Sequence, residues 1–262
     1  MPSPWHEQDD DTGGVRLHVR QLAGDGPPLI LLHGLGVSGA VWQAFARRLV
    51  PAWSPIAPDL RGHGQSGQPQ NGYAAADYAG DIVSLMDVLR VPQAPVVGHS
   101  LGALVALALA AAAPERVPTL ALLDPPLDAG RRNPDVEPVY RLRHAPPGEL
   151  ETYLARGSSS PLVARALAPL YRQAADAAFE AHLREVPGAP WAWEVAPSIG
   201  APVLVLQADP ALDGVLGDEA ARDFVARLPQ GRRLKLPGAR HAVHASHPAQ
   251  TAEAILRFLR GE

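Results

Sequence analysis

The sequence predicts an α/β protein with a doubly wound, mostly parallel β-sheet and an inserted helical cap. Short apolar runs alternate along the chain with longer segments whose apolar residues recur at helical spacing. Strands covered on both faces give such continuous runs, and their alternation with amphipathic helices is typical of parallel sheets. Residues 125–200 interrupt this rhythm, because they are rich in proline and contain no convincing strand. We therefore expect residues 1–124 and 201–262 to form the sheet domain and residues 125–200 to form the cap.

The expected strands and helices of the sheet domain follow one another in regular order. The first strand alternates apolar and polar side chains, and the others are short apolar runs bounded by turn residues. The expected strands cover residues 15–21, 28–32, 53–57, 94–98, 119–123, 202–207 and 232–236. The first expected helix begins near Ser38. The later ones cover residues 75–90, 101–113, 218–228 and 248–259.

Composition and charge exclude several classes of function. The formal net charge of −4 gives no electrostatic reason to expect a nucleic-acid partner. The chain has no cysteine, so neither a disulfide framework nor a thiolate metal site is possible. Its polar, acidic start is unlike a signal peptide, and the apolar segment 101–113 is too short to cross a membrane. We therefore expect a cytoplasmic protein without a membrane partner; the oligomeric state is not predicted.

The sequence GHSLG at residues 98–102 indicates a nucleophilic serine. It matches the pattern Gly-x-Ser-x-Gly and lies between a predicted strand and a predicted helix, which is the setting that this motif requires. The turn is so sharp that the serine backbone is strained, and the flanking glycines leave room where Cβ atoms would clash. Ser100 would then stand at a helix N-terminus, where backbone N–H groups favour an oxyanion.

A general base and an oxyanion hole are expected in two other loops. A serine hydroxyl is too weakly acidic to attack unaided, and His241 lies in the loop between the last predicted strand and the last helix. Among ten histidines its nearest rivals, His244 and His247, fall at the start of that helix. Residues 33–36, His-Gly-Leu-Gly, follow an early strand, so we expect oxyanion donors at the backbone amides of Leu35 and Leu101.

With these motifs in place, the chain resembles the α/β-hydrolase superfamily in its small, cap-bearing form. The motifs that carry the resemblance are residues 33–36, 59–66, 98–102 and 237–241. The resemblance extends over nearly the whole chain outside the cap. It implies a catalytic triad in the chain order serine, acid, histidine. In this comparison residues 59–66 resemble a structural turn of the superfamily and carry no catalytic role.

The acid of the triad departs from the usual pattern, which is Gly-x-x-Asp after the strand at residues 202–207. Here the residue expected to be acidic is an alanine, and Asp209 and Asp213 lie two positions to either side of it. Asp124 is the alternative that we favour, because zearalenone-type lactonases resemble this chain in placing the acid 24 residues after the nucleophile. Their elbow and cap differ, so the resemblance concerns the acid rather than the substrate.

These residues predict a serine hydrolase that cleaves carboxylic esters or lactones of small to medium apolar substrates through an acyl-enzyme. The chemistry needs no metal and no organic cofactor, and the expected partner is the small-molecule substrate. We expect the cap to set substrate size, with Trp191 and Trp193 presenting aromatic surface to the pocket; alternatively both merely hold the cap to the core. Thioesterase and C–C hydrolase activities use the same triad, and a non-hydrolytic receptor or a lyase uses the same fold.

Overall fold

The computed structural model describes residues 5–50, 52–131, 136–157, 161–185 and 187–262. Within these residues the chain forms an eight-stranded sheet in the order β1-β2-β4-β3-β5-β6-β7-β8. Strand β2 pairs antiparallel with both β1 and β4, and all other neighbours are parallel. This mostly parallel sheet with its helices confirms the predicted fold class.

Apart from β1, the strands lie within two residues of the ranges expected from the sequence. The strands are β1 (Trp5–Asp11), β2 (Arg16–Leu22), β3 (Pro28–Leu32), β4 (Ser54–Pro58), β5 (Val96–His99), β6 (Leu120–Leu123), β7 (Val203–Gln207) and β8 (Gly231–Lys235). The residues of β3 alternate between two hydrophobic clusters, Leu29 and Leu31 on one face and Ile30 and Leu32 on the other. Because both faces are buried, the strand is apolar throughout.

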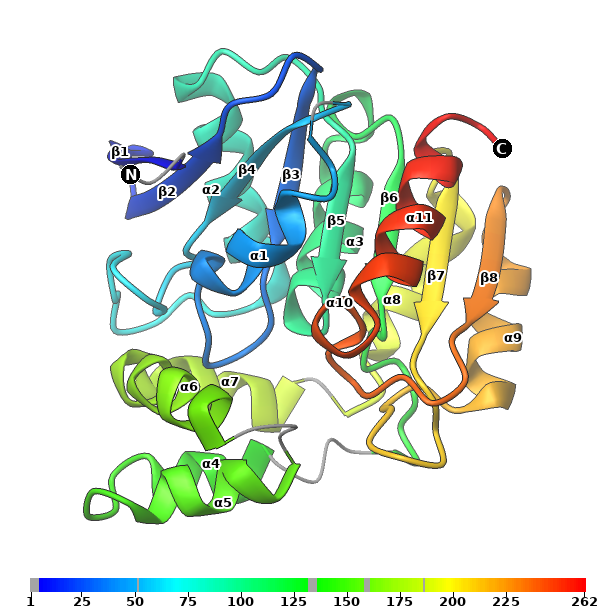
Figure 1. Ribbon diagram of the computed structural model, residues 1–262. Coiled ribbons are helices and arrows are strands. Elements are labelled where there is room, and N and C mark those ends of the chain that lie inside the picture. Colours follow the sequence, from blue (N-terminus) through cyan, green and yellow to red (C-terminus); the bar gives the residue numbers. More distant parts are fainter. Residues whose placement is uncertain (1–4, 51, 132–135, 158–160, 186) are drawn as a thin grey trace.

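Helices cover both faces of the sheet (Figure 1). One face packs against α1 (Gln43–Ala46) and α11 (Pro248–Leu259), and the other against α2 (Ala75–Val88), α3 (Leu101–Ala112) and α9 (Asp218–Arg227). The remaining short helices of this domain are η1 (Gly39–Trp42), η2 (Pro114–Arg116) and α10 (Val243–Ser246). No helix in the described part of the chain is long and apolar enough to cross a membrane.

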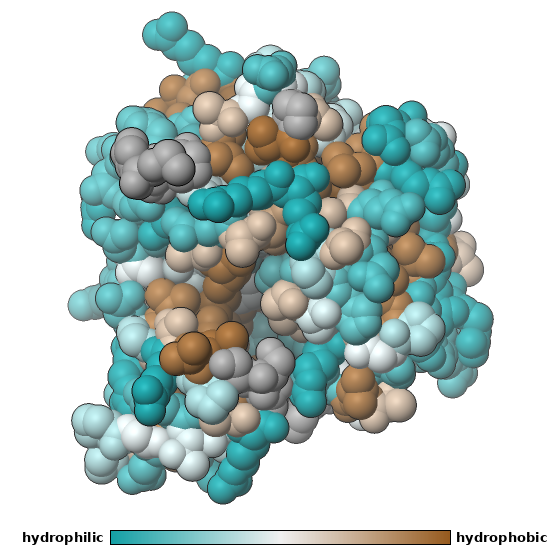
Figure 2. Space-filling view, in the orientation of Figure 1, coloured by the Kyte–Doolittle hydropathy of each residue, from teal (hydrophilic) through white to brown (hydrophobic). Residues whose placement is uncertain are grey.

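The described part of the chain between β6 and β7 contains helices joined by turns and no strand. Its helices are α4 (Val136–Leu142), α5 (Glu149–Gly157), α6 (Pro161–Gln173), α7 (Asp176–Glu185), α8 (Pro190–Val195) and η3 (Ala196–Ser198). Helices α4 to α7 lie below the carboxyl ends of the strands in Figure 1. In the same orientation, the surface is hollowed between the sheet domain and these helices, and hydrophobic residues border the hollow (Figure 2).

Strand β1 at the edge of the sheet was not predicted from the sequence. Its residues are mostly exposed and polar, so the apolar alternation that reveals a half-buried strand is absent. Its carboxylates are instead balanced by basic residues of β2: Asp9 lies 2.7 Å from Arg16 Nη1 and 2.9 Å from His18 Nδ1. Cross-strand charge pairs of this kind stabilise a strand without burying it.

The turn after β4 is held by a buried carboxylate. Asp59 is fully buried, and its Oδ1 accepts hydrogen bonds from Arg20 Nη1 at 2.5 Å and from the Gly39 amide at 2.8 Å. Its Oδ2 accepts from the Gln65 amide at 2.9 Å. A buried charge is tolerated when it is paired and hydrogen-bonded in this way. The turn therefore has the structural character that the resemblance implied.

Two glycines let α3 pack directly on the sheet. A Cβ on Gly98 would lie 2.2 Å from the Gly102 carbonyl oxygen, and a Cβ on Gly102 would lie 2.2 Å from the Leu32 carbonyl oxygen. Both distances are far below van der Waals contact, and the obstructing atoms belong to the backbone. Glycine is therefore required at both ends of the turn between β5 and α3.

Replacing Gly102 and Gly80 by alanine tests this requirement, because both glycines lie inside helices. We expect Gly102→Ala to lower the free energy of unfolding by roughly 2–3 kcal/mol, as overpacking does. Gly80 has nothing within 4 Å of its Cβ position, so Gly80→Ala should raise the free energy of unfolding by about 0.5–1 kcal/mol through helix propensity. Urea unfolding measures both, and effects of equal sign and size would contradict the packing argument.

Candidate active site

Ser100 lies at the point where β5 turns into α3. Its φ is +52°, in the left-handed region that residues with a Cβ rarely adopt. Strain of this kind persists only where the surrounding structure imposes it, and it is common at functional sites. The residue is 7% exposed. The hydroxyl of this candidate nucleophile makes no hydrogen bond to another described residue.

Backbone hydrogen bonds continue beyond the carboxyl ends of the parallel strands and align the loops that follow them. The Ser100 amide donates to the Leu123 carbonyl oxygen at 3.0 Å, and the Asp124 amide donates to the Leu206 carbonyl oxygen at 2.7 Å. These bonds fix the first residue after β5 against β6 and the first residue after β6 against β7. Candidate side chains from different loops are thereby gathered at one edge of the sheet.

The structure brings His241 and Asp124 together. His241 Nδ1 lies 2.7 Å from Asp124 Oδ2, and the carboxylate is fully buried. The same carboxylate accepts hydrogen bonds from the amides of Ala208 at 3.2 Å and Val215 at 2.9 Å. Because a carboxylate only accepts, His241 Nδ1 carries the proton and Nε2 is left free to act as a base.

The other two candidate acids contact the backbone of the histidine loop rather than the imidazole. Asp213 Oδ1 accepts a hydrogen bond from the His241 amide at 2.8 Å, and its Oδ2 lies 3.2 Å from Arg240 Nη1. Asp209 accepts from the amides of Gly238 at 2.8 Å and Ala211 at 3.0 Å. These hydrogen bonds lower the pKa of Asp209 below its usual range. Both aspartates therefore shape the loop that carries His241.

The backbone amides of Leu35 and Leu101 are the candidate oxyanion donors. Neither N–H has an acceptor among the residues that the structure describes. The Leu35 turn rests against the helices between β6 and β7, because a Cβ on Gly36 would lie 2.4 Å from Tyr171 Cδ1 and 2.8 Å from Phe179 Cζ. Gly36 has a φ of +76°, so glycine suits this position in both space and conformation.

Neutral histidines pack behind the site. His99 Nε2 donates to the His241 carbonyl oxygen at 3.1 Å, and the His99 ring lies 4.7 Å from that of His241 and 4.8 Å from that of His244. Burial, with the neighbouring His241 and His244, holds the pKa of His99 well below its ordinary value. Burial also lowers the pKa of His33 to about 4 and that of His244 to about 3. His99 and His244 therefore pack around the His241 loop as uncharged residues. His33 instead bonds the Gly34 carbonyl oxygen and the Leu60 amide.

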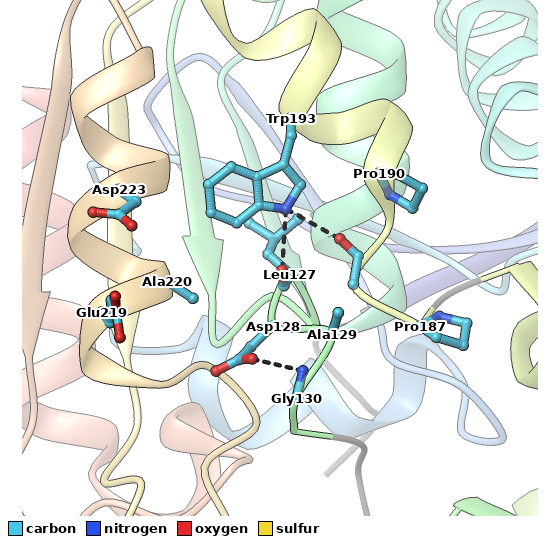
Figure 3. A pocket seen from close by; sticks show the side chains of 11 residues that line it. Leu127, Asp128, Ala129, Gly130, Pro187, Pro190, Trp193, Glu219, Ala220 and Asp223 are labelled. Atoms are coloured by element: carbon cyan, nitrogen blue, oxygen red, sulfur yellow. Dashed lines mark hydrogen bonds between the residues drawn. The ribbon is translucent and has the colours of Figure 1, made fainter.

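The two tryptophans of the sequence analysis lie in different places. Trp191 lines a chamber beside Leu101. Trp193 lines a groove between α8, α9 and the chain after β6, whose lining includes neither Ser100 nor His241 (Figure 3). The Trp193 Nε1 donates to the carbonyl oxygens of Leu127 and Gly188, both at 3.1 Å. Only the first tryptophan therefore adjoins the candidate oxyanion hole.

Tyr78 and His182 also line the chamber beside Leu101, and sequence reasoning did not single them out. Tyr78 belongs to the apolar side of α2 and His182 to α7, so both occupy positions that look like ordinary packing positions in a helix. Their place in the chamber, and the unpaired Nδ1 of His182, become visible only in three dimensions.

The chain belongs to the α/β-hydrolase fold family, whose model matches residues 27–248. It is similar to Lipase LipV of Mycobacterium tuberculosis, with 32% identity over 248 residues that cover 94% of this chain and 85% of the lipase. It is also similar to 2-(acetamidomethylene)succinate hydrolase of Mesorhizobium japonicum, with 40% identity over 114 residues that cover 44% of this chain and 41% of that protein.

Other relatives match over only part of their length, whereas solved structures match throughout. An uncharacterized protein of Mycobacterium bovis is 38% identical over 136 residues, which are 52% of this chain and 39% of that relative. The structure of E-2-(acetamidomethylene)succinate hydrolase is 26% identical, with a TM-score of 0.80 over 98% of this chain and 99% of that chain. The enol-lactonase of Burkholderia xenovorans is 22% identical, with a TM-score of 0.80 over 97% and 100% of the two chains, and shows likeness of fold alone.

The buried histidines predict that the protein loses stability in mild acid. Below pH 6.5 the imidazoles of the unfolded chain bind protons that His33 and His244 cannot bind when folded, so unfolding becomes easier as the pH falls towards 4. Above pH 6.5 both states are neutral and this effect vanishes. Each such histidine contributes a slope of about 1.4 kcal/mol per pH unit.

Urea unfolding between pH 7.5 and 4.5 measures this slope in the wild type and in His244→Phe, which cannot titrate. We expect the variant to have a shallower slope by the equivalent of one proton. His6→Phe is the matched control for the substitution itself, because His6 is exposed on β1; the effect of burial is the difference in slope between the two variants. Equal slopes in all three proteins would contradict the prediction.

Proposed function

We propose that the protein is a serine hydrolase that cleaves carboxylic esters, cyclic esters (lactones) included, through an acyl-enzyme. The observation that carries the proposal is the hydrogen bond of 2.7 Å between His241 Nδ1 and the buried Asp124 carboxylate. The serine at positive φ after β5 supplies the candidate nucleophile. A base of fixed tautomer and a strained serine at a helix N-terminus are the two groups that nucleophilic acyl transfer requires. Family membership supports the reaction class, and fold alone does not fix the substrate.

In the proposed mechanism, Ser100 Oγ attacks the ester carbonyl carbon while His241 Nε2 takes the hydroxyl proton. The amides of Leu35 and Leu101 stabilise the resulting oxyanion, and Asp124 stabilises the imidazolium. The intermediate collapses, the C–O bond to the alcohol breaks, and His241 returns the proton to the departing alkoxide. Water then attacks the acyl-enzyme by the same route and releases the carboxylic acid with the free serine.

Residues 125–200 are proposed to act as the cap of this enzyme. Tyr171 and Phe179 lie against the turn that carries the Leu35 amide, and Trp191 lies beside Leu101. The cap therefore contributes apolar and aromatic walls next to both candidate oxyanion donors. The relatives named as a lipase and as a 2-(acetamidomethylene)succinate hydrolase support hydrolysis in general, and their names do not assign a substrate to this chain.

Ser100→Ala tests the nucleophile. We expect esterase activity to fall by roughly 10⁶, because the acyl-enzyme can no longer form, while circular dichroism shows an unchanged fold. An organophosphonate should label the wild type at Ser100 alone and should fail to label the variant. Turnover of p-nitrophenyl acetate by the variant within about tenfold of wild type would sink the assignment.

Three aspartate-to-asparagine variants test the acid. Asp124→Asn should lower kcat by roughly 10⁴, because the imidazole loses its charged partner and its tautomer. Asp209→Asn and Asp213→Asn serve as matched controls and should cost far less, since these side chains bond the loop backbone. Initial rates at neutral pH compare the three variants; near-wild-type activity of Asp124→Asn would rule this residue out.

A further inference from the structure

A small enclosed chamber lies beside Leu101 at the junction of the sheet domain and the helices between β6 and β7. Its cavity volume is about 20 Å³, enough for one water-sized group. Residues of α2, α3, α7 and α8 surround it, most of them apolar. Because Leu101 supplies a candidate oxyanion amide, the chamber adjoins the place where the scissile carbonyl would bind.

Two polar side chains in this chamber lack a partner in the protein. His182 Nδ1 is buried and has no hydrogen-bond partner in the described part of the chain. Tyr78 is 1% exposed, and its hydroxyl makes no hydrogen bond to any residue that the structure describes. By contrast, the hydroxyl of Tyr73, which lines the same chamber, donates to the Pro69 carbonyl oxygen at 2.7 Å. Buried polar atoms are normally paired, so the unpaired nitrogen of His182 requires an explanation. The Tyr78 hydroxyl is a second group of this chamber without a partner among the described residues.

We infer that Tyr78 and His182 form a polar subsite that binds a small hydroxyl or carbonyl oxygen on the acyl group of the substrate. A hydroxyl group both donates and accepts, and so matches a phenol and an imidazole nitrogen together. Burial lowers the pKa of His182 to about 4, so the ring is neutral at physiological pH and suits an uncharged oxygen better than an anion. This inference rests on the proposed ester hydrolysis and specifies its substrate class.

The enclosed position of the chamber assigns it to the acyl group rather than to the alcohol. The alcohol must leave after the first half of the reaction, whereas the acyl group stays attached to Ser100 until water attacks. A chamber with walls from both the sheet domain and the cap helices suits the acyl group, which stays on the enzyme. Its size admits a single hydroxyl or carbonyl oxygen, and a glycolyl group is a short acyl group that carries a hydroxyl.

Phenyl glycolate and phenyl propionate test the subsite, because their acyl groups differ only by a hydroxyl in place of a methyl group. The measured quantity is the ratio of kcat/KM for glycolate to kcat/KM for propionate, divided by the same ratio for hydroxide-catalysed hydrolysis. We expect this corrected ratio to exceed one in the wild type. Tyr78→Phe and His182→Leu should each lower it roughly tenfold, the usual effect of one lost hydrogen bond.

Two further measurements separate binding from a structural role. Tyr78→Phe and His182→Leu should have melting temperatures equal to or above that of the wild type, because the atoms removed have no partner in the protein. His182→Asn should recover part of the ratio, since its amide can still donate and accept. Tyr140→Phe is the control: its hydroxyl donates to Glu180 Oε1 at 2.9 Å on the surface, and its loss should leave the ratio unchanged.

An unchanged ratio in both Tyr78→Phe and His182→Leu would overturn the subsite, and so would a wild type that prefers propionate after correction. If hydrolysis of both esters still depends on Ser100, the proposed function survives either result. A wild type that hydrolyses neither ester also overturns the subsite. In that case organophosphonate labelling of Ser100 decides whether the proposed function fails with it.

Discussion

The parallel hydrogen-bond register at the carboxyl ends of β5, β6 and β7 is the constraint on which the rest of the site depends. Ser100 is bonded through its backbone to the end of β6, and Asp124 to the end of β7. The end of β6 therefore positions Ser100, and the end of β7 positions Asp124. With Asp124 fixed in this way, its carboxylate can bond the His241 imidazole and the amides of the β7 loop at once.

Much of this arrangement could be predicted from the sequence, because it depends on local chemistry. Continuous apolar runs reveal strands covered on both faces, and GHSLG at residues 98–102 reveals a turn that tolerates no Cβ at its glycines. Likewise, the position of His241 after the last strand follows from chain order. The β1 strand escaped prediction because its stabilising partners are charges on β2, and charge pairing leaves no periodic signal along one strand.

Contacts between distant segments could not be predicted. Three aspartates occupy suitable loops, and only the structure brings one of them, Asp124, within hydrogen-bond distance of the imidazole. Trp191 and Trp193 are two residues apart in one short helix, yet they line different cavities because a helix points such neighbours in different directions. The unpaired nitrogen of His182 is likewise a property of its surroundings, which the residue type does not report.

The contact between the cap and Gly36 links substrate entry to the geometry of the oxyanion hole. Helices α6 and α7 rest on this turn through Tyr171 and Phe179, and the Leu35 amide belongs to the same turn. Any movement of these helices away from the turn would therefore also remove packing from behind the Leu35 amide. A ligand that binds only when the helices rest on the turn would favour that arrangement over any in which they are displaced.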